Sequence, residues 1–269
     1  MDLLYCDESN LENRENEFLL YGGVRIPGDQ AAALSNRIEE LRAESGLAPD
    51  AQLKFNPAPD GLTHEAFRDL KQSIIEAAIE HDCQFLAYVA LHNIAGEPDV
   101  ARRYGINTIC YHFHCCLNRE DKNGLVLIDR FNDEGNRIDG HLRDKMSIGV
   151  QLPHENEPTR LSTINGFHYS AIGQSHFTSL ADILISSLRW AINVHSRNTG
   201  DLRDNALTLL RVMSPLFFRY DAGAAVPDLG FCFSPMNVKV AAYHKLYLDL
   251  QGFLREGGID SSQIITNNR

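Results

Sequence analysis

The sequence predicts an α/β protein in which a mixed sheet is flanked by helices. An apolar hairpin opens the chain, segments with the apolar pattern of strands then alternate with segments of helical periodicity, and no linker marks a second domain. We therefore expect residues 1–269 to form a single domain. Within it, residues from about 200 to 269 are expected to form a C-terminal helical extension.

Apolar spacing and turn residues place the individual elements. An antiparallel hairpin is expected from residues 3–6 and 18–26, joined by a polar connection over residues 7–16. Apolar residues recur at helical spacing over 28–45, 63–81, 100–118, 180–194 and 238–255. Further strands are expected at 85–91, 125–129 and 161–169, with a polar loop between Pro153 and Pro158.

Composition and charge restrict the class of protein. With 43% hydrophobic and 23% charged residues, the chain has the composition of an ordinary folded domain. The acidic start and the lack of an apolar run of about 20 residues lead us to expect a cytoplasmic protein without a membrane span. The six cysteines form no CxxC pair, so we expect free and mostly buried thiols.

Three aspartates point to a divalent-metal site. Asp7 and Asp129 each follow an apolar strand, and Asp182 lies in an unusually apolar helix. Ligands of open α/β sheets gather at strand ends. Neighbouring carboxylates raise each other's pKa unless a cation neutralises them, and Mg²⁺ prefers oxygen ligands of this kind. Metal ions held by such a cluster support in-line cleavage of a phosphodiester.

Each of these acids also has a structural explanation. Residues 7–10 suit a turn, because Asp and Asn bond to their own backbone there. Residues 179–182 suit a helix capping box, with Asp182 in the first turn. The pattern of the acids alone leaves both interpretations open.

An ordered set of motifs adds to the pattern: Tyr5, Asp7, Glu8 and Ser9, then Gly22-Gly23-Val24, a lysine motif at Lys54, a strand that ends at Asp129, and Leu180-Ala181-Asp182. Over roughly residues 3–195 this set resembles the uncharacterised family numbered 3800 in the domain-of-unknown-function series. The family is similar to the ribonuclease H-like superfamily, whose acids on the first strand, a central strand and a late helix bind magnesium. The resemblance implies a ribonuclease H-like mixed sheet.

The resemblance also implies the roles of individual residues. It makes Asp7, Asp129 and Asp182 ligands of Mg²⁺ or Mn²⁺, and Lys54 a contact to substrate phosphate. Three positions depart from the family pattern, namely Asn10 in place of Gly, Gln52 in place of Glu, and Ser179 in place of Gln. Because a neutral amide does not offset the charge of a cation, Gln52 is expected to weaken metal binding or activity.

The resulting functional expectation is a metal-dependent nuclease that hydrolyses phosphodiester bonds in RNA or DNA. Its predicted catalytic residues are Asp7, Glu8, Asp129 and Asp182, and its predicted substrate-binding residues are Lys54 and His176, of which His176 is suited to proton transfer. The alternative is a non-catalytic ribonuclease H-like module that binds nucleic acid or a protein partner.

Two further groups of residues suggest other binding sites, one for zinc and one for nucleic acid. A cluster of zinc-type ligands lies at Cys110, His112, His114, Cys115 and Cys116, but its spacing matches no usual zinc motif. The net charge of −11 opposes nonspecific attraction to phosphate, so a nucleic-acid partner requires a local basic groove. Candidates for that groove are Arg102, Arg103, Arg119 and Lys122, or Arg189, Arg197 and Arg203.

Overall fold

A six-stranded mixed sheet forms the centre of the protein. The computed structural model describes residues 1–9, 14–130, 135, 137–152 and 155–268, so the predicted features at Asn10 and Pro153 lie outside the described residues. The strands are β1 (Asp2–Ser9), β2 (Phe18–Ile26), β3 (Gln84–Leu91), β4 (Gly124–Asp129), β5 (Ile164–Ser170) and β6 (Phe231–Ser234). Their order in the sheet is β5-β4-β1-β2-β3-β6.

The direction of the strands follows from their connections. β2 runs antiparallel to both of its neighbours, β1 and β3. β4 lies parallel to β1, β5 parallel to β4, and β6 parallel to β3. The hairpin supplies only the antiparallel β1–β2 pair, because β2 reaches β3 through the longer connection of residues 27–83. Each parallel pair also requires a longer crossover connection. The amino acid pattern therefore predicted the mixed α/β class correctly.

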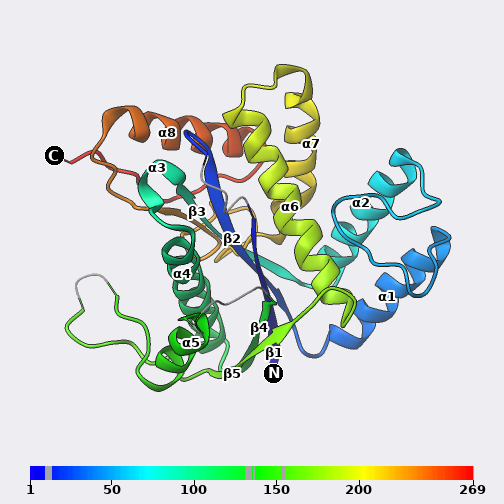
Figure 1. Ribbon diagram of the computed structural model, residues 1–269, viewed down its shortest axis with the longest axis horizontal. Coiled ribbons are helices and arrows are strands. Elements are labelled where there is room, and N and C mark those ends of the chain that lie inside the picture. The colour runs from blue at the N-terminus through cyan, green and yellow to red at the C-terminus, as the bar shows by residue number, and fades with distance from the viewer. Residues whose placement is uncertain (10–13, 131–134, 136, 153–154, 269) are drawn as a thin grey trace.

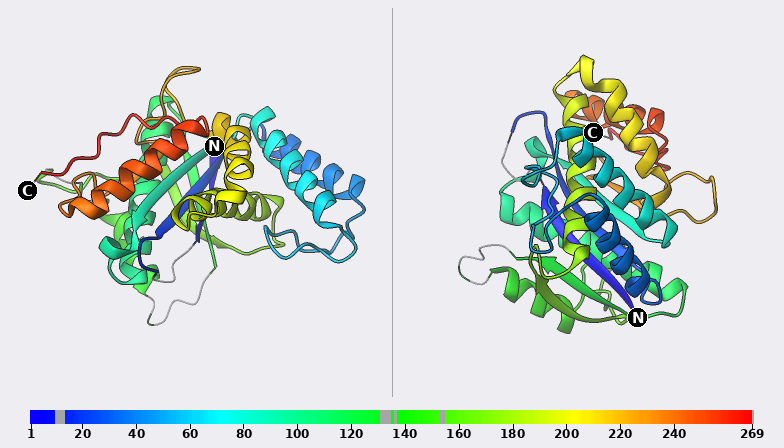
Figure 2. Two further views of the ribbon diagram at one scale, coloured as in Figure 1. Left: turned by 90° about the horizontal axis from the view of Figure 1, so that it is seen from above. Right: turned by 90° about the vertical axis from the view of Figure 1, so that its right-hand side faces the viewer.

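Helices cover both faces of this sheet (Figures 1 and 2). They are α1 (Ala31–Glu44), α2 (His64–Glu80), α3 (His92–Ala95), α4 (Pro98–Arg119), α5 (Arg137–Ser147), α6 (His176–Ser196), α7 (Arg203–Met213) and α8 (Ala241–Glu256), with 3₁₀ turns η2 (Gly200–Leu202) and η3 (Ser214–Leu216). One core cluster joins the sheet to α1, α2, α6, α7 and α8, and a second joins it to α4 and α5. We refer to these two sides as the α6 face and the α4 face.

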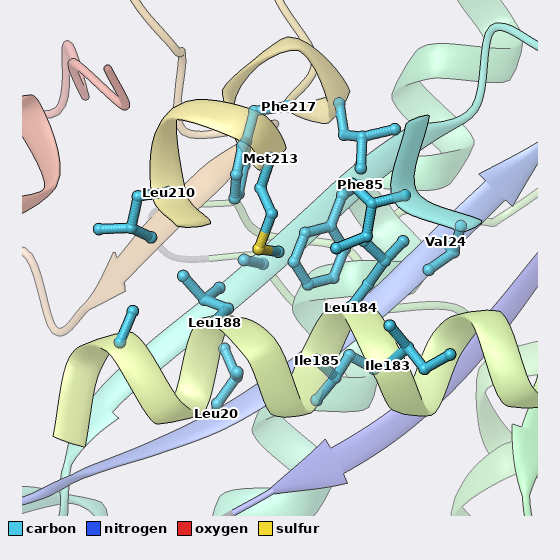
Figure 3. Packing of buried hydrophobic residues seen from close by; sticks show 14 of the residues in the cluster. Leu20, Val24, Phe85, Ile183, Leu184, Ile185, Leu188, Leu210, Met213 and Phe217 are labelled. Atoms are coloured by element: carbon cyan, nitrogen blue, oxygen red, sulfur yellow. The ribbon is translucent and has the colours of Figure 1, made fainter. Parts of the chain in front are cut away.

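Helix α6 is the centre of the first cluster (Figure 3). Ile183, Leu184 and Leu188 are fully buried, because the helix is covered by the sheet on one side and by other helices on the opposite side. Its first turn is capped by Ser175, whose hydroxyl oxygen accepts a hydrogen bond from the Phe177 N–H at 3.1 Å. The ring of Phe177 packs edge-on against Tyr5 of β1, which fixes the helix to the strand.

Most elements predicted from the sequence are present, with three corrections. Strand β1 continues to Ser9 through pairing with β2, so the turn interpretation of residues 7–10 is wrong where the chain is described. Helix α6 begins at His176, so Asp182 lies beyond the first turn and the capping-box interpretation is wrong. The C-terminal region is not only helical, because β6 joins the central sheet beside β3.

Two predictions about the chain as a whole can be compared with the structure. All six cysteines are free thiols, and Cys6, Cys83, Cys110 and Cys116 are buried. Among the described residues, no helix has the length and apolar character needed to cross a membrane.

Candidate functional site

Asp7 and Asp129 lie side by side on neighbouring parallel strands. The last parallel pair between β1 and β4 joins Cys6 to Ile128, and the two aspartates are the next residue on each strand. Neighbouring strands are roughly 4.8 Å apart, and residues in register point to the same face of a sheet. The sheet therefore brings the two carboxylates together.

The face to which they point is set by the residues around them. Tyr5 and Leu127, two positions earlier on each strand, pack in the core of the α6 face. Across the hairpin, Asp7 pairs with Gly22, where a Cβ atom would lie only 2.8 Å from the Ile185 side chain of α6. Because side chains alternate along a strand, Asp7 and Asp129 point toward α6. Gly22 is required there because α6 approaches the sheet so closely.

Asp182 adds the third carboxylate from α6 itself, three residues before Ile185. Its Oδ2 accepts a hydrogen bond from the Phe55 N–H at 2.6 Å, and its Oδ1 lies 3.5 Å from the Ser186 hydroxyl. The Phe55 contact holds the loop between α1 and α2 against the carboxylates. The exposed Lys54 precedes Phe55 in this loop, and its charge acts on Asp129.

Burial and mutual repulsion perturb these acids. Burial, followed by the charges of Asp129 and Glu8, raises the pKa of Asp7 to about 8, and Asp182 adds to the effect. Burial also raises the pKa of Asp129, and the charge of Asp182 raises it further, while Lys54 opposes the shift. Among the described residues the cationic charge near Asp7 and Asp129 is thus too small to offset the acids. This is the electrostatic situation that a bound cation relieves.

Glu8 points away from this group. As the neighbour of Asp7 along β1 it faces α4, where its Oε1 accepts hydrogen bonds from the Arg102 guanidinium at 2.8 and 3.0 Å. Its other oxygen, Oε2, is buried without a hydrogen-bond partner among the described residues. Burial raises the pKa of Glu8, although Arg102 lowers it. Glu8 therefore acts on the aspartates through its charge, from the opposite face of the sheet.

His176, the other residue predicted to contact substrate, lies at the start of α6. Its Nε2 is 3.3 Å from the Glu39 carboxylate of α1. Burial lowers its pKa, against the effect of Glu39. This contact turns His176 toward α1, and no contact in the described residues joins it to the three aspartates.

Lys71 is a further cation near the site that the sequence analysis missed. Its ammonium group lies 4.2 Å from the ring centres of both Phe55 and Phe67, and it donates a hydrogen bond to the Phe55 carbonyl oxygen at 3.2 Å. Burial lowers its pKa, whereas Asp182 raises it. A lysine beside the apolar stripe of α2, four residues after Phe67, is the signal that identifies it.

The aspartates can be tested as a metal site by their donor chemistry. No group of three or more His, Cys, Asp or Glu side chains among the described residues is arranged to hold a metal ion as the side chains stand. Mg²⁺, however, is usually bound through only one or two protein carboxylates together with water and substrate phosphate. Asp7 and Asp129 supply two adjacent carboxylates, and within the part of the chain that the structure describes no strong cationic partner offsets them. The residues present therefore fit a Mg²⁺ or Mn²⁺ ion.

The residues of the possible zinc site on α4 have separate structural roles. Cys110 and Cys116 are buried in the core of the α4 face. His114 contacts the Thr163 hydroxyl at 2.7 Å, and burial lowers the pKa of His112 to about 4. These side chains are held by core packing and by a local hydrogen bond.

The two candidate basic groups differ in their surroundings. In the first, Arg102 pairs with Glu8 and Asp99, and Lys122 pairs with Glu120. In the second, Arg189 and Arg197 line one pocket near Phe55, whereas Arg203 pairs with Glu256. Among the described residues, only the second group places arginines in a pocket that Phe55, the residue hydrogen-bonded to Asp182, also lines.

Comparison of the chain with protein-family models, with curated proteins and with solved structures finds no match. The family resemblance therefore remains a prediction made from the ordered motifs.

Proposed function

We propose that the protein is a Mg²⁺- or Mn²⁺-dependent nuclease with a ribonuclease H-like fold, which hydrolyses phosphodiester bonds in RNA or DNA. The observation that carries this proposal is the pairing of Asp7 with Asp129 on adjacent strands, facing Asp182 of α6. Acids on the first strand, on a central strand and on a late helix are the set that the family resemblance implies. Their raised pKa values supply the physical reason for a cation.

Each residue has a separate role in the proposed reaction. Asp7 and Asp129 hold the cation, and a bound Mg²⁺ or Mn²⁺ supplies the charge that activates water and stabilises the leaving oxygen. Asp182 completes the acidic group and positions the loop through the Phe55 N–H. Lys54, exposed on that loop, contacts a substrate phosphate. Glu8 supports the group from the opposite face.

Gln52 limits the strength of the proposed metal site. Its side chain is exposed in the loop that carries Lys54, and it stands where the family pattern has a glutamate. Because the amide contributes no negative charge, we expect weaker metal binding than a fourth carboxylate would give. Gln52→Glu should therefore lower the concentration of Mg²⁺ needed for half-maximal cleavage.

A metal-dependent cleavage screen tests the proposal. Single- and double-stranded RNA, DNA and hybrid duplexes are incubated with the protein in Mg²⁺, in Mn²⁺ and in EDTA. We expect cleavage only with a metal ion, and a loss on the order of 100-fold or more in Asp7→Asn and in Asp129→Asn, because each removes one preorganised charge. Thermal unfolding of each variant establishes that it is folded.

The matched control is Asp69→Asn, the same chemical change on the exposed surface of α2, where Asp69 pairs with Arg68. It should cleave like the wild type. Undiminished cleavage by both Asp7→Asn and Asp129→Asn would overturn the proposal. Binding of nucleic acid or of a protein partner without cleavage under any condition would instead support the non-catalytic alternative.

A further inference from the structure

A pocket of about 610 Å³ lies along α6, lined by residues from Arg189 onward and by Phe55. Phe55 connects the two sites, because it lines the pocket while its N–H is bound by Asp182. Farther along α6, Arg189, Trp190 and Asn193 line the same pocket. Asp182, Ser186, Arg189 and Asn193 recur at helical spacing, so a polar stripe leads along α6 from the acids into the pocket.

Two residues that line this pocket carry buried polar atoms without a hydrogen-bond partner among the described residues. These atoms are Arg189 Nε and Asn193 Oδ1. Buried polar atoms are normally paired, so an unpaired donor and an unpaired acceptor on two residues that line one pocket favour an external partner. Arg197 also lines the pocket, but Glu17 accepts two hydrogen bonds from it, at 2.8 and 2.9 Å. Within the described part of the chain, Arg189 is thus a lining cation with an unpaired donor.

The walls of the pocket restrict the class of ligand. Arginine recognises phosphate through a planar set of donors, and Arg14 adds a second guanidinium to the lining. Trp190 and Phe55 add aromatic side chains, on which proteins commonly stack the bases of single strands. The volume is in the range of small-molecule sites and suits one nucleotide. Paired bases within a duplex do not present a free face to such a wall.

We propose that this pocket, hereafter the Trp190 pocket, binds one nucleotide of a single-stranded nucleic acid and directs the strand to Asp7, Asp129 and Asp182. The proposal rests on the proposed nuclease function for the direction of the strand, whereas the binding step is independent of cleavage. Arg189 lies seven residues beyond Asp182, or roughly 10 Å along the helix axis. This length corresponds to about three stacked nucleotides. The substrate class is thus a single strand or an unpaired strand end.

The fluorescence of Trp190 measures occupancy of the pocket directly, because it is the only tryptophan in the chain. The full-length protein in EDTA is titrated with 12-nucleotide single strands of RNA and DNA, with the matching duplexes, with nucleoside monophosphates and with inorganic phosphate. Single strands should quench the emission to saturation, and duplexes should bind at least about tenfold more weakly. Equal affinity for duplexes, no quenching by any strand, or equal affinity for inorganic phosphate would overturn the proposal.

Substitutions in the pocket make the test specific. Arg189→Gln should weaken single-strand binding at least about tenfold, as expected for loss of a charge-assisted hydrogen bond. Arg143→Gln, the same change on the exposed surface of α5, should leave binding unchanged. If Arg189→Gln is not folded, Asn56→Asp serves in its place, because Asn56 is an exposed lining residue and an added negative charge should repel phosphate. Wild-type affinity in a folded pocket variant would contradict the proposal.

The two proposals fail in different ways. If single strands quench Trp190 only when Arg189 is present, and the protein cleaves no nucleic acid, the result supports binding in the Trp190 pocket and overturns the proposed nuclease function. If wild type and Arg189→Gln cleave single strands in the presence of metal with the same KM, the result supports the nuclease function and overturns strand binding in the Trp190 pocket.

Discussion

Strand β1 carries an aspartate near each end, buried at Asp2 and half-buried at Asp7, and the two carboxylates meet different charges. Near its start, Asp2 is 2% exposed, and its Oδ2 accepts hydrogen bonds from Arg25 at 2.6 and 2.9 Å. Arg25 also pairs with Glu120 and lowers the pKa of that carboxyl to about 2. Near the other end, Asp7 lies beside further acids, and its pKa is raised to about 8.

This contrast separates a structural ion pair from a candidate binding site. At the Asp2 end, the protein supplies the cation, and removal of that cation would leave carboxylates buried and unpaired. At the Asp7 end, the acids face one another, and the nearby lysines only partly offset them. This repulsion between acids at one end of β1, in a protein that pairs its acids at the other end, supports the proposed site for an external cation.

The largest effect is expected at the paired end. Arg25→Met should lower the free energy of unfolding by about 3–5 kcal/mol, because it leaves buried carboxylates without their partner. Urea-induced unfolding, followed by circular dichroism, measures this change. Arg37→Met, which breaks an exposed pair with Glu40 on α1, is the control and should hardly move the midpoint. A similarly small change in Arg25→Met would show that the Asp2 end is not held by its ion pair.

Over the interval from pH 6.5 to 8, a smaller effect of opposite origin is expected at the Asp7 end. Because its pKa in the folded protein lies above the ordinary 3.8, Asp7 keeps a proton between pH 3.8 and about 8 that the unfolded chain has lost. Its contribution to the free energy of unfolding therefore falls as pH rises through this window, by at most about 1.4 kcal/mol per pH unit. Without divalent cations, the melting temperature of the wild type should fall between pH 6.5 and 8.

The measurement is restricted to pH 6.5–8 because buried histidines change the stability in the opposite direction at lower pH. Burial lowers the pKa of His112 and of His141 to about 4, whereas a histidine in the unfolded chain has a pKa of 6.5. The contribution of these histidines to stability therefore rises as the pH increases from about 4 to 6.5. Above pH 6.5 the histidines no longer change the stability, and the titration of Asp7 determines how it depends on pH. Asp7→Asn removes the titrating group, so its melting temperature should depend less on pH and should exceed that of the wild type at pH 8. Parallel pH profiles for the two proteins would show that Asp7 is ionised like an ordinary aspartate.

The positions that the sequence predicted well are those set by local pattern. An apolar run followed by Asp129 identified the end of β4, and parallel pairing with β1 then placed this residue beside Asp7. The hairpin and the apolar character of α6 were equally clear. These features depend on the periodicity of neighbouring residues, which one sequence contains in full.

The features that were missed depend on pairing or on distant contacts. The sequence analysis ended β1 before Asp7, whereas pairing with β2 extends it to Ser9 and turns Glu8 to the opposite face. Lys71 joins the site from a separate helix, Arg14 lines the Trp190 pocket from a connecting segment, and no local spacing relates either of them to Asp182. The four-residue strand β6 is too short to show a period within a region rich in proline and glycine.

Binding of Mn²⁺ at pH 8.5 tests the contrast between the two ends of β1 most directly. Electron paramagnetic resonance measures free Mn²⁺ during titration of the wild type, Asp7→Asn, Asp129→Asn and the surface control Asp69→Asn. We expect Mn²⁺ binding by the wild type and by the control, with affinity at least about tenfold lower in the two site variants, because each removes a carboxylate ligand. Equal Mn²⁺ affinity in all four proteins, or none in the wild type, would contradict a cation site at the Asp7 end.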